Sequence, residues 1–232
     1  MLTKVNLLHS KLKATGIHLC ISLVLFLMIA SWLYWQLYPS FYFSMSGGSQ
    51  GLWLMLGVDM IVGPILTFFV FNPNKKMCEI LSDLTIIGLI QLAALSYGMH
   101  TVYQERPQLV LMFEQGTATV LNAREVAEDP KLSTYLKKAN NTIETIPVSL
   151  NLAENGQVVH IDPLTKPSIL IQLTQESRRF ITKPDEITKL KAIESQHSQI
   201  YILSMMGKYT GAYIILDPQL NYLGKISEKP TP

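Results

Sequence analysis

The stretch GLWLMLGVDMIVGPILTFFVF, residues 51–71, decides how this chain folds. It is long and apolar enough to cross a membrane, yet it contains one acidic side chain, Asp59. A carboxylate inside a span costs about 2.5 to 3.5 kcal/mol on insertion scales, so it usually faces a bundle interior or a partner. We therefore expect Asp59 to point inward, away from lipid.

The same stretch predicts a narrow seam of small and polar residues. Asp59, Gly63 and Thr67 follow one another at intervals of four residues, so they share one helical face. Such a seam lets a second backbone approach closely and form hydrogen bonds within the bilayer. Pro64 lacks a backbone donor, which predicts a kink just beyond Gly63. The large apolar residues expected to point elsewhere are Leu54, Met55 and Ile61.

The composition of the chain changes near His100. Its 232 residues are 48% hydrophobic and 16% charged, and the mean hydropathy is +0.23. Soluble domains carry about 25% charged residues. Residues 1–100 hold five of the 19 Lys and Arg and three of the 17 Asp and Glu. This division predicts a membrane anchor followed by a globular domain, residues 101–232, long enough to build its own core.

Three membrane spans are predicted, at residues 17–38, 51–71 and 80–99. Lysines precede the first span and follow the second, whereas residues 39–50 carry no charge. The positive-inside rule therefore places residues 1–16 in the cytoplasm and residues 101–232 outside, in a bacterium the periplasm. A cleaved signal peptide is disfavoured, because the first apolar run exceeds an h-region of 7–15 residues. An interfacial aromatic belt is expected at Trp32, Tyr34, Trp35, Tyr38, Phe41, Tyr42 and Phe43.

Polar side chains on all three spans are expected to meet. A rise of 1.5 Å per residue places Asp59 about 11 Å, and Gln91 about 13 Å, from the outer ends of their spans. By the same reckoning, His18, Ser22, Thr67 and Asp83 lie within about 8 Å of the inner face. A hydrogen-bonded packing seam explains this interior more simply than an ion pathway, since the three spans lack inverted repeats. No metal site is predicted, because no second His or Cys stands at ligand spacing from His18.

Three stretches of the first half resemble the TfpX/TfpZ family of type IV pilin accessory proteins. They are KATGIHLCIS from Lys13, GVDMIVGPILTFFVF from Gly57, and SDLTIIGLIQLAALSYGMHTVYQERP up to Pro107. The most specific element is GVD followed by GPxLT in residues 57–67. The chain departs from the family pattern at Glu105, where a small residue is expected. The resemblance implies a helper without catalytic activity or cofactor that affects how much pilin is assembled and displayed.

The resemblance also implies a partner, the type IV major pilin. An unassembled pilin has one long apolar helix carrying a lone acid, and a globular head outside. The polar seam would hold the helix, and the outer domain would touch the head. The lipid bilayer and the pilus assembly machinery are further expected contacts. The candidate partner-binding residues are Asp59, Gly63, Pro64, Thr67, Gln91, His18, Asp83 and Arg106, the last close enough to the surface to meet headgroups or the uncharged loop 39–50.

Residues 101–232 are expected to form an α+β domain with an antiparallel sheet. Apolar runs around Gln115 and Gly116 indicate a hairpin, Asn155 and Gly156 a turn, and Pro130 the restart of a helix in residues 124–140. The clearest helix lies in residues 182–195, with Pro184 in its first turn. Further strands are expected at residues 168–173, 199–205, 211–217 and, after a turn, at the end of 217–226.

No catalytic or nucleic-acid-binding pattern stands out in this domain. His160 and Asp162 are explained by a strand end and an Asp-Pro turn, and no Lys/Arg cluster exceeds a pair. Cys20 and Cys78 both precede the domain, so no disulfide framework is expected in it. Two alternatives to a pilin accessory role stay open. One is a membrane sensor with an outer ligand-binding domain, disfavoured because only short segments remain inside; the other is a transporter that depends on titration of Asp59.

Overall fold

The computed structural model describes residues 4–113, 117–138, 150–154, 157–161 and 167–230. The chain divides into two compact units. The first, called the helical unit, comprises Met1–Leu33 and Ser49–Tyr103. The second, called the sheet unit, comprises Tyr34–Gly48 and Gln104–Pro232. The sheet unit therefore includes residues 34–48, which are the end of the first predicted span and most of the loop that follows it.

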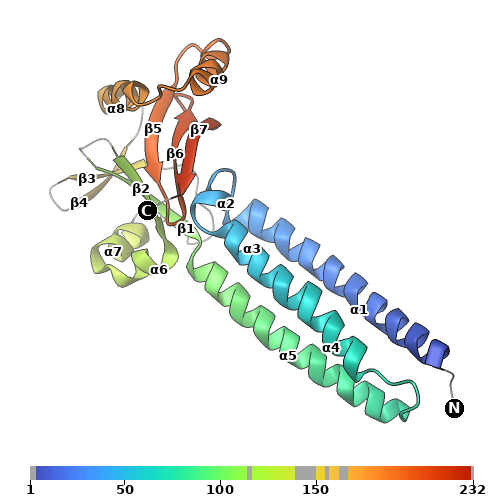
Figure 1. The fold of residues 1–232 in the computed structure, drawn as a ribbon. Coiled ribbons are helices and arrows are strands. Elements are labelled where there is room, and N and C mark those ends of the chain that lie inside the picture. Colours follow the sequence, from blue (N-terminus) through green and yellow to red (C-terminus); the bar gives the residue numbers. More distant parts are fainter. Residues whose placement is uncertain (1–3, 114–116, 139–149, 155–156, 162–166, 231–232) are drawn as a thin grey trace. The chain divides into compact units, whose positions relative to one another are not determined.

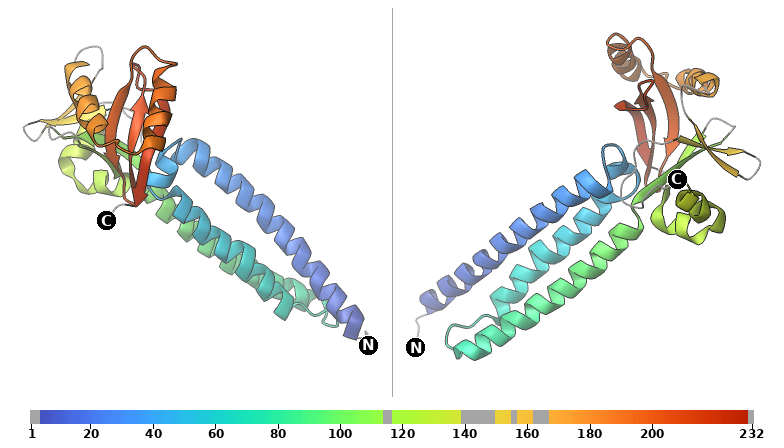
Figure 2. Two further views of the ribbon diagram at one scale, coloured as in Figure 1. Left: turned by 45° about the horizontal axis from the view of Figure 1, so that its top comes forward. Right: turned by 180° about the vertical axis from the view of Figure 1, so that it is seen from behind.

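The helical unit contains three apolar helices that are long enough to cross a membrane (Figure 1). The first is α1 (Lys4–Trp32), extended by the π-helical η1 (Leu33–Leu37). The second is built from α3 (Gly48–Leu56), the π-helical η2 (Gly57–Val62) and α4 (Gly63–Val70), and the third is α5 (Met77–Gln104). Figure 2 shows these helices, coloured blue to green, running side by side.

The second span departs from regular α-helix just before Pro64, in η2. In η2 the backbone widens, and the N–H of Gly63 donates to the carbonyl of Val58, five residues earlier. A proline has no N–H and its ring crowds the carbonyl four residues back, so a wider turn relieves the conflict. Regular α-helix resumes with Pro64 in the first turn of α4.

The second and third helices approach closely at two glycines. A Cβ on Gly51 would lie 2.5 Å from Cγ2 of Val102, and a Cβ on Gly98 would lie 3.8 Å from Cε of Met55. Met55 is buried, so the expectation that it points away from the seam is wrong. It precedes Asp59 by four residues and belongs to the same inward face. Leu54 and Ile61 are exposed, as expected.

The described strands of the sheet unit form one seven-stranded sheet in the order β4-β3-β1-β2-β5-β6-β7. Their bounds are β1 Pro107–Met112, β2 Thr117–Asn122, β3 Leu150–Glu154, β4 Gln157–Ile161, β5 Tyr201–Met206, β6 Thr210–Leu216 and β7 Tyr222–Pro230. The sheet is mixed: β1–β2, β3–β4, β5–β6 and β6–β7 pair antiparallel, as predicted, whereas β1 pairs with β3, and β2 with β5, in parallel. Helices precede both β3 and β5, and such long connections let a strand return in the same direction.

Alternating residues of the strands build a core on each face of the sheet. Val110 and Met112 of β1 face one cluster, which is completed by α2 (Tyr42–Met45) and α8 (Pro167–Arg179). Leu109 and Leu111 face the other side, where α6 (Ala123–Glu128) and α7 (Pro130–Lys138) pack. Helix α9 (Pro184–Glu194) covers β5, β6 and β7 through Leu190 and its neighbours. Because successive side chains of a strand point to opposite faces, β1 contributes apolar residues to the cores on both faces of the sheet.

Most elements predicted for this unit are present, and one is of the wrong type. The hairpin β1–β2, the helix at Pro130, α9 and β5 to β7 are confirmed, whereas residues 168–173 belong to α8. In α8 the buried residues lie three or four positions apart, the pattern of one helical face: Leu170, Leu173, Thr174 and Ser177. The predicted turn residues 115–116 and 155–156 lie outside the described residues.

The segment 34–48, which contains most of η1 and all of α2, is an integral part of the sheet unit. Tyr38, Phe41 and Tyr42 are buried, so they form core and not an interfacial belt. The backbone N–H of Tyr209 donates to the carbonyl of Met45 at 3.0 Å. Gly47 has φ +98, and a Cβ there would lie 2.5 Å from Cε2 of Tyr209, so only glycine fits this position without strain.

Candidate functional site

The helical unit contains a cavity of about 790 Å³. It follows α1 from Ser10 to Leu25, a length of about 22 Å at the helical rise, and α5 from Leu84 to Leu95, about 16 Å. The cavity is therefore elongated along the helix axes. Its polar lining residues are Ser10, Lys13, His18, Ser22, Asp59, Thr67 and Gln91. The other lining residues are Ala14, Ile17, Ile21, Leu25, Phe71, Leu84, Gly88, Leu92 and Leu95.

The floor of the cavity is formed where three helices meet at Gly63. Oγ1 of Thr67 in α4 lies 2.7 Å from Nδ1 of His18 in α1, a hydrogen bond between two spans. A Cβ on Gly63 would lie 2.0 Å from Nε2 of Gln91 in α5 and 3.0 Å from Nε2 of His18. The missing side chain at residue 63 thus makes room for an amide and an imidazole from two other helices.

Asp59 differs from the other floor residues because its carboxylate is unpaired. The residue is 7% exposed and lines the cavity. Among the described residues, no hydrogen bond to this carboxylate is found, and the attraction acting on it is electrostatic and comes from His18. A buried acid without a hydrogen-bond partner is costly, so this group has an unmet demand for a donor.

Five of the eight predicted site residues come together here: His18, Asp59, Gly63, Thr67 and Gln91. Pro64 is buried beside them and faces a smaller groove next to Thr15. Asp83 does not join them, because its carboxylate pairs with Nζ of Lys75 at 2.5 Å. Arg106 is 3% exposed within the sheet unit, so the expectation that it meets lipid headgroups is wrong.

Sequence reasoning missed several of the residues that line the cavity. Lys13 and Gly88 were not singled out, although Gly88 precedes Gln91 by three residues and so lies on the same face of α5. That spacing is the signal that could have found it. A Cβ on Gly88 meets nothing within 4 Å, so this residue leaves the cavity open.

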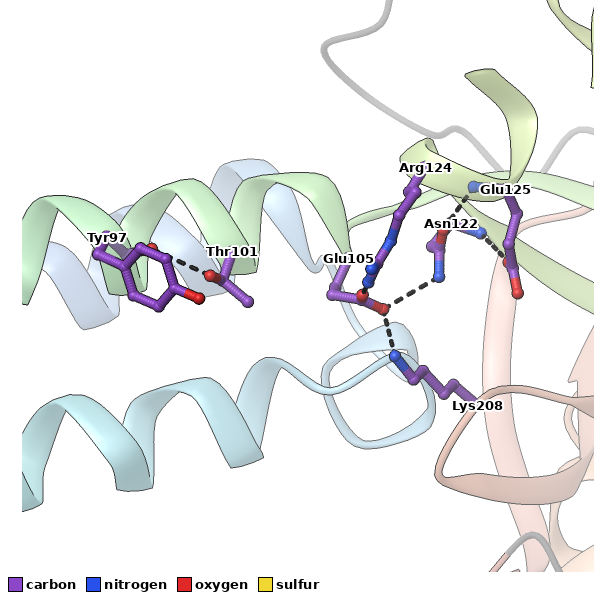
Figure 3. Close-up of polar contacts among 7 residues, drawn as sticks. All are labelled: Tyr97, Thr101, Glu105, Asn122, Arg124, Glu125 and Lys208. Carbon is purple, nitrogen blue, oxygen red and sulfur yellow. Dashed lines mark hydrogen bonds and ion pairs between the residues drawn. The ribbon is translucent and has the colours of Figure 1, made fainter. Parts of the chain in front are cut away.

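A second polar cluster lies in the sheet unit around Glu105 (Figure 3). Its carboxylate pairs with Arg124 and with Nζ of Lys208 at 2.6 Å, and it accepts a hydrogen bond from Nδ2 of Asn122 at 3.0 Å. Asn122 also caps α6 in a reciprocal capping box with Glu125. Glu105 is therefore a satisfied buried acid that joins β1, α6 and the β5–β6 turn, which accounts for an acid where a small residue was expected.

No other chemical centre is found in the described parts of the chain. Among those residues, no group of three or more His, Cys, Asp and Glu side chains could hold a metal ion. Cys20 and Cys78 are free and exposed. Of the pair His160 and Asp162, the second lies outside the described residues. The cavity of the helical unit is thus the candidate site.

Three known proteins that are similar to this chain come from Dichelobacter nodosus. The chain is 34% identical over 117 residues to "Fimbrial assembly protein, serogroup E1" and to "Fimbrial assembly protein, serogroup I". It is 33% identical over 117 residues to "Fimbrial assembly protein, serogroups C1 and C2". Each match takes 50% of this chain; it covers 45% of each of the first two relatives and 88% of the third. The chain thus spans about half the length of the first two. No family model matches, and no solved structure matches.

Proposed function

Because this chain belongs to the family of fimbrial assembly proteins, we propose that it is a membrane-bound accessory protein that handles the fimbrial subunit before assembly. More narrowly, we propose the role of the TfpX/TfpZ pilin accessory proteins, which its first half resembles. The partner would be a type IV major pilin, with the pilus assembly machinery as a further contact. The role is one of binding and presentation, without a catalytic step.

The observation that carries this proposal is the cavity with its unpaired acid. Three helices of spanning length surround a cavity of about 790 Å³, a size within the range of about 300 to 1,000 Å³ typical of binding sites. Its walls are apolar, and its floor combines a buried carboxylate with the hydrogen-bonded pair of His18 and Thr67. Such a site favours an occupant that is itself a membrane segment, because it offers apolar contact and a polar group at one depth.

The proposed location is the inner membrane, with the N-terminus in the cytoplasm and the sheet unit in the periplasm. Three apolar helices support insertion, and the lysines beside the first and second spans support this orientation. In this arrangement the sheet unit would stand on the side where a subunit's globular head emerges.

The proposal is tested by removing the chain from its host and restoring it. We expect surface fimbriae to fall strongly in the deletion strain and to return on re-expression, while transcription of the subunit gene stays constant. Crosslinking in intact membranes should then capture the fimbrial subunit on this chain. Unchanged surface fimbriae in the deletion strain would overturn the proposed function.

A further inference from the structure

The cavity ends where the second and third helices close upon each other. Gly51 lies against Val102, and Met55 lies against Gly98, so one turn beyond Asp59 the helices are in contact. From Asp59 toward Lys13, in contrast, the lining residues of α1 and α5 face a common space. Asp59 therefore lies toward the closed end of an elongated cavity whose other end carries a lysine.

The chemistry of this closed end restricts what can occupy it. Asp59 as a residue is 7% exposed, and the described residues provide its carboxylate with no hydrogen bond. His18 already uses Nδ1 in its hydrogen bond with Thr67. An occupant that brings a hydrogen-bond donor to this depth would satisfy the acid, whereas an acyl chain would leave it unpaired in a drier site.

We infer that the cavity is the docking site for one apolar membrane helix of the fimbrial subunit, and that Asp59 accepts a hydrogen bond from a donor or cation on that helix. The inference rests on the proposed function and deepens it. The unmet demand of the Asp59 carboxylate for a hydrogen-bond donor restricts the occupant to one that brings a donor to this depth. The predicted spans of this chain contain no Lys or Arg, so a second copy would bring no cation to this depth.

The elongated shape agrees with a helix as the occupant. The lining of α1 runs for about 22 Å, which is four turns of helix, and the lining of α5 for about three. Ile21, Leu92 and Leu95 provide apolar walls along this length. A helix laid between α1 and α5 would bury its side chains against these walls and place its own polar group near the floor.

Two glycines provide a matched pair of variants. Gly88 lines the cavity and Gly16 does not, yet a Cβ on either meets nothing within 4 Å. Gly88→Leu should fill the cavity without a clash, and Gly16→Leu should add the same side chain to α1 outside it. We expect Gly88→Leu to abolish capture of the subunit and to lower surface fimbriae, with the protein itself at a normal level. Gly16→Leu should behave as wild type.

A photo-crosslinking amino acid at two positions of α5 locates the contact. Leu92 lines the cavity and Leu89 does not, although the two are 58% and 61% exposed. We expect the subunit to be captured from position 92 in the full chain and not from position 89. Asp59→Asn should reduce capture from position 92 several-fold, and Asp59→Glu should retain part of it.

The outcomes separate this inference from the proposed function. Adducts at position 92 that contain only lipid, or only a second copy of this chain, would overturn the helix as occupant. Capture of the subunit through the sheet unit, with normal surface fimbriae in Gly88→Leu, would overturn the cavity as the site and leave the accessory role standing. If deletion of the whole chain leaves fimbriae unchanged, the accessory role itself fails.

Discussion

At the scale of single residues, Gly63 shows how an absent side chain builds the site. The seam of Asp59, Gly63 and Thr67 was predicted from its four-residue spacing, and the structure brings Gln91 and His18 onto it. A Cβ at residue 63 would overlap the Gln91 amide at 2.0 Å. The glycine is therefore needed for close approach of three helices, as in other membrane bundles.

Enlarging this residue should loosen the bundle. Gly63→Val must displace both Gln91 and His18, and overpacking of this kind costs about 1 to 3 kcal/mol. We expect a lower steady-state level in the membrane and earlier thermal aggregation in detergent. Gly57→Val, in the same span but with open space at its Cβ, is the control and should be milder. Equal effects of the two variants would mean that helix propensity, and not packing at Gly63, decides the outcome.

Replacing Asp59 separates the two roles that a buried acid can have. Asp59→Asn keeps the shape and a hydrogen-bonding group but removes the charge, whereas Asp59→Leu removes both. Hydrogen bonds between membrane helices average only about 0.6 kcal/mol, so Asp59→Asn should stay inserted and abundant. If the charge meets a donor or cation of the subunit, surface fimbriae and crosslinking should nevertheless fall.

The readouts for Asp59 are the level of the protein, surface fimbriae and subunit crosslinking, compared in one strain background. Normal values of all three in Asp59→Asn, with loss of the protein in Asp59→Leu, would show that Asp59 is a packing residue.

Glu186 in the sheet unit gives a prediction about acid. Oγ of Ser227 donates to Oε1 of Glu186 at 2.5 Å, and Nζ of Lys183 lies 3.3 Å from the same carboxylate. The hydrogen bond from Ser227, aided by Lys183, holds the pKa of Glu186 below its ordinary value of 4.5. The unfolded chain then binds a proton that the folded chain does not, so this contribution to stability is present above about pH 4.5 and is lost below it.

This prediction is checked on the full chain in detergent, at pH 7 and near pH 4. Thermal unfolding gives the overall stability, and hydrogen exchange gives the protection of α9 and β7. Wild type should lose more protection on acidification than Glu186→Gln, which cannot titrate at this position. An identical loss in both proteins would assign the acid sensitivity to other carboxylates.

At the scale of elements, local patterns predicted what depends on local chemistry. The three spans, the β1–β2 hairpin and α9 follow from apolar runs, turn residues and charges at helix ends. Residues 168–173 were predicted as a strand because a short apolar run fits either structure. Thr174 shows what decides between them: its hydroxyl donates to Leu170 and accepts from the backbone N–H of Ile202 in β5.

The errors share a cause, because each depends on partners distant in the sequence. Parallel pairing of β1 with β3 depends on where a helical connection returns, which no local pattern fixes. Phe41 and Tyr42 were assigned to a membrane interface, and aromatic residues are typical of interfaces and cores alike. Likewise, the seam of the site was predictable from spacing, whereas the cavity depends on the relative placement of α1 and α5.

The π-helical turn before Pro64 yields a prediction about rotation. A π-helical turn holds about one residue more than an α-helical turn. Converting it to α-helix therefore rotates the preceding segment by about 100° relative to the rest, given 3.6 residues per turn. Pro64→Ala should let η2 relax to α-helix and turn Met55 and Asp59 away from α5. In a background with Cys20 and Cys78 replaced by Ser, cysteines at positions 55 and 98 should crosslink, and Pro64→Ala should weaken this crosslink.

A second pair of cysteines, at positions 59 and 91, should crosslink by the same reasoning, since both side chains line one cavity. Persistent failure at both pairs, with neighbouring positions reacting instead, would mean that the helices are rotated from the arrangement described. Unchanged crosslinking in Pro64→Ala would show that the proline does not hold the π-helical turn open.

At the scale of the whole molecule, the two units constrain the path of the chain through a membrane. The sheet unit contains both Tyr34–Gly48 and Gln104–Pro232, so these two segments must lie on the same side. Between them the chain passes through α3, η2 and α4, and then α5. Two crossings return it to the side it left, whereas one crossing or three would separate the halves of one folded unit.

Membership of one folded unit places the two segments in one compartment, whereas the orientation depends on the lysines. Single cysteines in the background without Cys20 and Cys78 can test both. A cysteine at Ser40, in the loop, and one at Ser195, after α9, are exposed positions of the sheet unit, and Lys76 is an exposed position between α4 and α5. We expect a membrane-impermeant maleimide added to the periplasm to label positions 40 and 195 and to leave position 76 unlabelled.

A reporter active only in the periplasm should correspondingly work when fused after Met99 and be silent after Lys76. Labelling at position 76 alone would reverse the orientation and keep the pairing of the two segments, whereas opposite labelling of positions 40 and 195 would contradict the sheet unit itself.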